Sequence, residues 1–212
     1  MRFARQHFMN DTRADANPNA TATAGPDPTP NPSHAMASSD AVGAAPYEAP
    51  AMLSIEGSGT GPDSYPVEVG FVLPDGSSRC ALIRPLAHWT HWDDLAEHSH
   101  AVPRETAVKL GRDSTQVAAL LNSSLAGQLV YCDGPAVDPT WLRVLFEAAG
   151  TVPAFELHDF RELLSERENA FWHVLKRQVT TEMRLQRRRA SSDAKILQRT
   201  LLRLRSPLPL RR

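Results

Sequence analysis

The pattern of apolar and polar positions predicts strands first and then alternating strands and helices. Three segments, at 51–57, 65–74 and 78–86, are rich in β-branched and aromatic residues, which is typical of β-strands. The tripeptide PDG at 74–76 predicts a hairpin turn between the second and third segments. This region therefore predicts an antiparallel three-stranded meander.

Further along the chain, segments of helical period alternate with strand-like segments. The predicted helices cover 91–100, 103–111, 113–127, 138–150 and 190–204, and the predicted strands cover 128–134 and 153–160. In the helix at 138–150, Asp138 is expected to be the N-cap and Pro139 the first helical residue. The expected buried stripes of the three longer helices are Val117, Leu120, Leu121 and Leu125; Leu142, Leu145, Phe146 and Ala149; and Ile196, Leu197, Thr200, Leu201 and Leu204. The chain therefore predicts an α/β fold, with a mixed central sheet and helices packed on it.

The N-terminal region differs from the rest in composition. Residues 1–48 have few aliphatic residues, and seven of the 17 prolines lie within the first 50 positions, so this segment cannot bury enough apolar surface to order itself. We predict a disordered tail at 1–48, one domain at 49–206 and a basic tail at 207–212. No apolar run approaches the roughly 18 residues needed to span a bilayer, and we expect a cytoplasmic protein. Cys80 and Cys132 lie in apolar runs and are expected to be buried thiols.

The net charge of −1 hides a strong asymmetry. Residues 51–175 hold 8 basic and 17 acidic side chains, whereas residues 176–212 hold 12 basic and 2 acidic ones. The basic segment is compatible with a solvated helix face or with a surface that binds nucleic-acid phosphates, and we favour the second interpretation. Arg187, Arg188 and Arg189 are its densest cluster.

Three acidic residues stand at the ends of predicted elements rather than on solvated faces: Glu56, Asp138 and Asp193. Carboxylates of this kind can hold two divalent ions about 4 Å apart, which activate a water and stabilise the leaving oxygen in phosphodiester hydrolysis. A chain with 24 acidic residues contains many such triples, so the spacing alone is weak support.

The sequence around these acids resembles the DEDDh 3′–5′ exonucleases of the RNase H-like superfamily. The segment LSIEGSGTGPDSYPVEVGFVL resembles their first motif, LAGQLVYCDGPAVDPTWLRVLFEAAG the second, and RRASSDAKIL the third. The resemblance covers about 52–204. It implies an RNase H-like exonuclease fold with helices on both faces of the sheet, and Mg²⁺ or Mn²⁺ held by Glu56, Asp138 and Asp193.

Two positions depart from the family pattern. Ser54 stands where the first motif has Asp, and Arg188 stands where the third motif has its catalytic His. Arginine stays protonated and cannot accept a proton from water, and no histidine follows His173 to replace it. The expected metal site is therefore weak, with one ion or none.

Two functions remain open at this stage. The first is a 3′–5′ exonuclease that acts on single-stranded DNA or RNA ends, with weak or lost metal-dependent hydrolysis. The alternative is a catalytically inactive binding or scaffold protein with the same fold. Both substitutions favour the alternative, whereas the motif order and the three retained acids favour the nuclease.

Four further residues have two interpretations each. Glu68 is either a hydrogen-bonding partner of the site or a solvent-facing strand residue. His100, in a segment that resembles the His-Gly-Ile of the family, is either a nucleotide-groove residue or a structural histidine. Trp89 and Trp92 are either base-stacking residues or packing residues, and we favour packing.

Overall fold

The protein is built on one mixed five-stranded sheet. The computed structural model describes residues 48–134, 138–185 and 189–206. Its strands are β1 (Ala51–Gly57), β2 (Pro66–Val72), β3 (Ser78–Leu82), β4 (Leu129–Cys132) and β5 (Glu156–Asp159). They are arranged in the order β3-β2-β1-β4-β5, where β1, β2 and β3 pair antiparallel and β4 runs parallel to both β1 and β5. The predicted meander and mixed sheet are confirmed.

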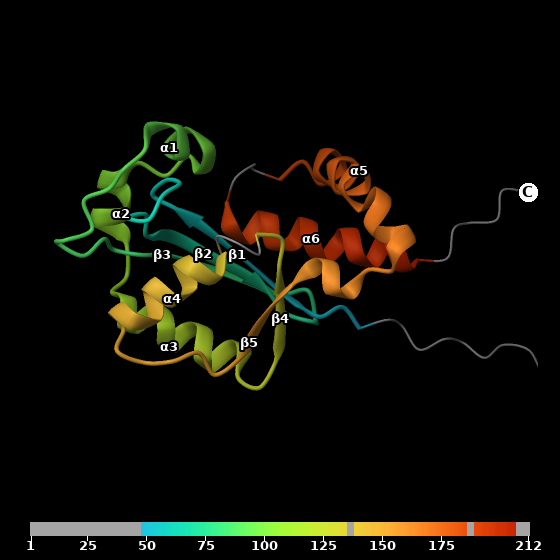
Figure 1. Ribbon diagram of the computed structural model, residues 1–212, viewed down its shortest axis with the longest axis horizontal. Helices are drawn as coiled ribbons and strands as arrows, with labels where there is room; N and C mark the ends of the chain where they lie inside the picture. The colour runs from blue at the N-terminus through green and yellow to red at the C-terminus, as the bar shows by residue number, and fades with distance from the viewer. Residues whose placement is uncertain (1–47, 135–137, 186–188, 207–212) are drawn as a thin grey trace, which may run out of the picture. The chain divides into compact units, whose positions relative to one another are not determined.

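Helices cover both faces of the sheet (Figure 1). They are α1 (Asp94–His100), α2 (Arg104–Leu110), α3 (Ser114–Leu125), α4 (Asp138–Ala148), α5 (Glu166–Met183) and α6 (Ala190–Arg205), with a short 3₁₀ helix, η1 (Phe160–Leu163). Figure 1 shows α3 and α4 on one face, and α6 running along the other with α5 beside it. The predicted helices correspond to α1, α2, α3, α4 and α6.

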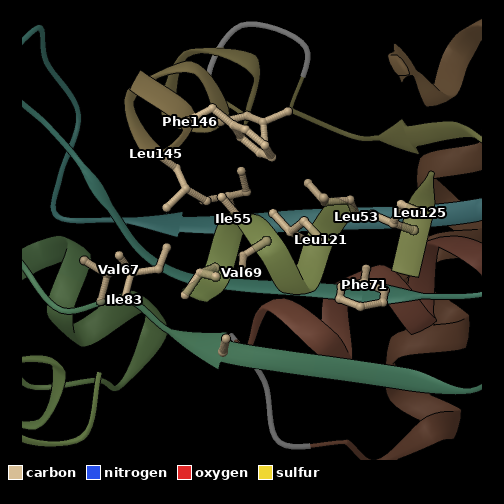
Figure 2. Packing of buried hydrophobic residues seen from close by; sticks show 14 of the residues in the cluster. Leu53, Ile55, Val67, Val69, Phe71, Ile83, Leu121, Leu125, Leu145 and Phe146 are labelled. Carbon is tan, nitrogen blue, oxygen red and sulfur yellow. The ribbon is translucent and has the colours of Figure 1, made fainter. Parts of the chain in front are cut away.

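The larger core lies between the sheet and the α3/α4 face. Figure 2 shows Leu53 and Ile55 of β1 directed at Leu121 and Leu125 of α3 and at Leu145 of α4. These five side chains are at most 4% exposed. Because strand side chains alternate between faces, burying Leu53 and Ile55 here directs Ser54 and Glu56 to the opposite face.

The smaller core lies on the α6 face. Met52 of β1 and Val72 of β2 pack there against Ala194, Leu197 and Leu201 of α6. The apolar stripe predicted for this helix is therefore confirmed at its centre.

Helix α5 was not predicted. Its 18 residues begin after Ser165, whose hydroxyl accepts a hydrogen bond from the Glu168 backbone N–H while the Glu168 carboxylate bonds back to the Ser165 backbone. This capping box was a readable sequence signal. The helix has one buried side chain, Val179, among its described residues, so its apolar period is weak.

The predicted tails at 1–48 and 207–212 lie outside the described residues, apart from Glu48, and remain predictions. In the described part of the chain, no helix is long and apolar enough to cross a membrane. Cys132 is buried as expected, but Cys80 is exposed on β3, because β3 lies at the edge of the sheet.

Candidate active site

Strand β1 presents Ser54 and Glu56 to the α6 side of the sheet. Across the antiparallel pair, Ser54 lies opposite Gly70 and Glu56 lies opposite Glu68. Opposed residues of neighbouring strands point to the same face, so all four positions lie on the α6 face of the sheet.

The N-terminal end of α6 lies directly on β2. A Cβ atom on Gly70 would be 2.0 Å from the Ser191 backbone nitrogen, so only glycine permits this approach. The approach brings Asp193, in the first turn of α6, to the end of β1.

Glu68 anchors the start of α6. Its carboxylate is fully buried, accepts a hydrogen bond from the Ala190 backbone N–H at 3.0 Å, and forms an ion pair with the Arg189 guanidinium. Arg189 Nε donates to both carboxylate oxygens at 2.9 and 3.0 Å. The solvent-facing interpretation of Glu68 is therefore wrong, because this buried carboxylate accepts a hydrogen bond from the first free N–H of the helix, that of Ala190.

Asp138 enters the site from the other side of the sheet. It is the first residue of α4, one position earlier than predicted, and only 6% exposed. Its Oδ1 accepts a hydrogen bond of 3.3 Å from the Ile55 backbone N–H. This contact holds the start of α4 against β1.

The carboxylates of Asp138 and Asp193 line a cleft of about 320 Å³. Its polar lining includes Ser54, Asp133, Asp138, Lys176 and Asp193. Glu56 lines a neighbouring pocket of about 340 Å³. The indole of Trp141 lines both cavities, and its Nε1 donates to Ser64 Oγ at 2.9 Å.

Glu56, Asp138 and Asp193 bind protons more tightly than free carboxylates do. Burial, followed by the charge of Asp193 and a hydrogen bond with it, raises the pKa of Glu56 to about 8. Burial raises the pKa of Asp138 to about 7, against the hydrogen bond from Ile55, which lowers it. Burial also raises the pKa of Asp193, while the nearby Lys176 charge opposes that rise. Glu56 is therefore near enough to Asp193 and to Asp138 for their charges to act on it.

Lys176 brings a positive charge into this acidic cleft. It lies on α5 and forms an ion pair with Asp133, the residue that follows β4. Both side chains are 30% exposed. Neither residue was singled out from the sequence: α5 was missed, and the 43 positions that separate the partners conceal their proximity.

The side chains present do not fit the two-ion site that the family resemblance implies. Within the ranges that the structure describes, no group of three or more His, Cys, Asp or Glu side chains is arranged to hold a metal ion. Ser54 contributes a neutral hydroxyl to the cleft, and Lys176 contributes a cation. Two divalent ions need several negatively charged oxygen ligands. This cleft has one carboxylate fewer than the family pattern implies, because Ser54 stands in place of Asp, and the Lys176 ammonium repels a cation.

His100 and Trp89, the other candidate residues considered from the sequence, are both buried and packed against aromatic rings. His100 is 1% exposed, accepts a hydrogen bond at Nδ1 from the Val102 backbone N–H, and packs edge-on against Trp92. It lines the same pocket as Glu56, so it is a packed histidine beside the site. Trp89 is 8% exposed and stacks on Tyr65, which confirms the packing interpretation.

Of the three clustered arginines, only Arg189 is described. Its guanidinium is bonded to Glu68, so the structure gives this residue an anchoring contact within the protein. Arg187 and Arg188, the latter at the position of the family histidine, lie outside the described residues.

The strand order and the helices on both faces of the sheet form an RNase H-like fold. Structures of exonuclease I are among the solved structures that it resembles. The zinc-bound Escherichia coli enzyme in complex with single-stranded DNA superposes with a TM-score of 0.56 at 14% identity, over 74% of this chain and 41% of the enzyme. Exonuclease I of Methylocaldum szegediense superposes with a TM-score of 0.54 at 14% identity, over the same shares of the two chains.

This likeness establishes the fold. The chain spans about two fifths of the length of these enzymes. By sequence, it matches no protein-family model and no curated protein.

Proposed function

We propose that this protein binds single-stranded nucleic-acid ends through an exonuclease-type cleft, and that its metal-dependent hydrolysis is weak or lost. The observation that carries the proposal is the cleft itself, in which Asp138 and Asp193 lie beside Ser54 on an exonuclease fold. Several of the neighbours are Escherichia coli exonuclease I in complex with single-stranded DNA or a dA16 oligonucleotide, which supports the choice of ligand.

The residues of the site favour nucleic-acid binding over metal-dependent hydrolysis. Glu56, Asp138 and Asp193 keep the positions that the resemblance assigns to metal ligands, which favours a protein derived from a nuclease. Ser54 and the Asp133–Lys176 ion pair reduce the negative charge available to a cation. We therefore expect loose binding of one Mg²⁺ or Mn²⁺ ion, or none, and little cleavage.

Binding to the nucleic acid is expected to depend on the basic C-terminal segment. Arginine–phosphate attraction weakens with salt, and removing one arginine that binds a phosphate lowers the salt slope by about one. Arg187 and Arg188 are the two arginines of the cluster that lie outside the described residues.

The test combines binding and cleavage on end-labelled single-stranded DNA and RNA. Fluorescence polarisation at several salt concentrations should show binding that weakens steeply with salt, with a shallower slope in the double variant Arg187→Ala, Arg188→Ala. Arg112→Ala, an exposed arginine in the acidic part of the sequence, is the control. Incubation with Mn²⁺ should give little cleavage, and any cleavage should disappear in Asp138→Asn. Absence of binding to either nucleic acid at low salt would refute the proposal.

A further inference from the structure

The cleft contains a lysine whose position is fixed from two sides. Lys176 Nζ forms an ion pair with Asp133 and lies 5.8 Å from the centroid of the Trp172 ring, on the same helix one turn earlier. An ammonium over an indole face is attracted by the quadrupole of the neutral ring, whose face is partially negative. The carboxylate and the ring together hold the charge in place.

The charge lies where a metal ion would have to bind. The cleft that Lys176 lines also contains Ser54, Asp138 and Asp193, which come from β1, α4 and α6. Lys176 lies close enough to Asp193 to act on its carboxyl electrostatically. A divalent ion bound between Asp138 and Asp193 would therefore share this small space with a fixed positive charge.

A second ion pair flanks the same acids. Arg189 neutralises Glu68, which lies opposite Glu56 in the β1–β2 pair. In the described part of the site, the two carboxylates next to the predicted ligands, Asp133 and Glu68, are thus each paired with a cation of the chain. They are not free to supply the charge that Ser54 lacks.

We propose that the Lys176 ammonium takes the place of a divalent cation in this cleft and excludes the ion. Lysine and Mg²⁺ both neutralise carboxylates, but lysine needs no complete ligand shell and remains attached to α5. The acids of the cleft are then stabilised without a metal. This inference rests on the proposed function only for the location of the metal site, and its test measures metal binding alone.

The first experiment measures free Mn²⁺ by electron paramagnetic resonance in titrations of the full chain. Lys176→Met removes the charge at similar length and should bind Mn²⁺ at least about tenfold more tightly than the wild type. Lys176→Arg keeps the charge and should bind Mn²⁺ as weakly as the wild type. Lys109→Met, on an exposed face of α2, changes the net charge equally and should not gain affinity.

These titrations separate the proposal from a purely structural role. If the ion pair only tethers α5 to the end of β4, Lys176→Met would lose stability without any gain in Mn²⁺ affinity, which would overturn the proposal.

A second measurement needs no variant. In the wild-type chain, 1 mM Mn²⁺ should leave the thermal unfolding midpoint unchanged, because binding to the native state alone would raise it. A clear rise would overturn the proposal. Failure to bind nucleic acid would refute the proposed function but would leave both metal measurements interpretable.

Discussion

Replacing Glu56 with Gln should stabilise the metal-free protein at pH 8 and have little effect at pH 5. The carboxyl lies between β1 and α6, where burial and the neighbouring Asp193 disfavour its charge. The substitution removes the ionisable group and keeps a side chain of nearly the same shape.

The expected change in the free energy of unfolding follows from the proton affinity of Glu56 in the folded and unfolded states. The pKa of Glu56 rises from 4.5 to about 8 on folding, so the native state holds a proton that the unfolded chain has released over this interval. Stability then falls as the pH rises from about 4.5 to about 8. At about 1.4 kcal/mol per tenfold change in proton affinity, the upper limit of this loss is about 5 kcal/mol. Because Asp193 shares the proton, we expect the variant to gain about 1–3 kcal/mol at pH 8.

The assay is urea unfolding in EDTA at pH 5, 6.5 and 8. The wild type should lose stability across the series, whereas Glu56→Gln should show a clearly smaller loss. Glu105→Gln, on an exposed position of α2, is the control and should follow the wild type. Parallel pH profiles for the wild type and Glu56→Gln would show that the carboxyl is not held in a charge-disfavouring environment, and the reasoning would fail.

Two further predictions concern the contact between β2 and the start of α6. Glu68→Gln should lower the free energy of unfolding by about 2 kcal/mol, because it leaves Arg189 without its buried charge partner; an unchanged denaturation midpoint would contradict the anchoring role. Gly70→Ala should cost about 1–3 kcal/mol, because the new methyl group overlaps the backbone at Ser191 and α6 must shift; a change below about 0.5 kcal/mol would show that α6 does not lie directly on β2.

Much of the fold was readable from the sequence because its signals are local. Alternating apolar residues in β1 and β2, the PDG turn and the stripes of α3, α4 and α6 each depend on neighbours within a few positions. The same alternation places Ser54 and Glu56 on one face of β1. Helix α5 was missed because it lies at the surface and its apolar face is short of buried residues.

The partners of the charged residues were decided by tertiary structure. Glu68 alternates like a solvent-facing strand residue, yet α6 covers it and supplies Arg189 from 121 positions away. Lys176 belongs to a basic segment and Asp133 to a strand end, and only the packing of α5 beside β4 joins them. A sequence determines which side chain carries a charge, but the energy of that charge depends on its burial and on its neighbours in space. The sequence by itself therefore singled out Glu56, Asp138 and Asp193, whereas the folded structure showed that Lys176 and Arg189 pair with Asp133 and Glu68, the carboxylates beside them.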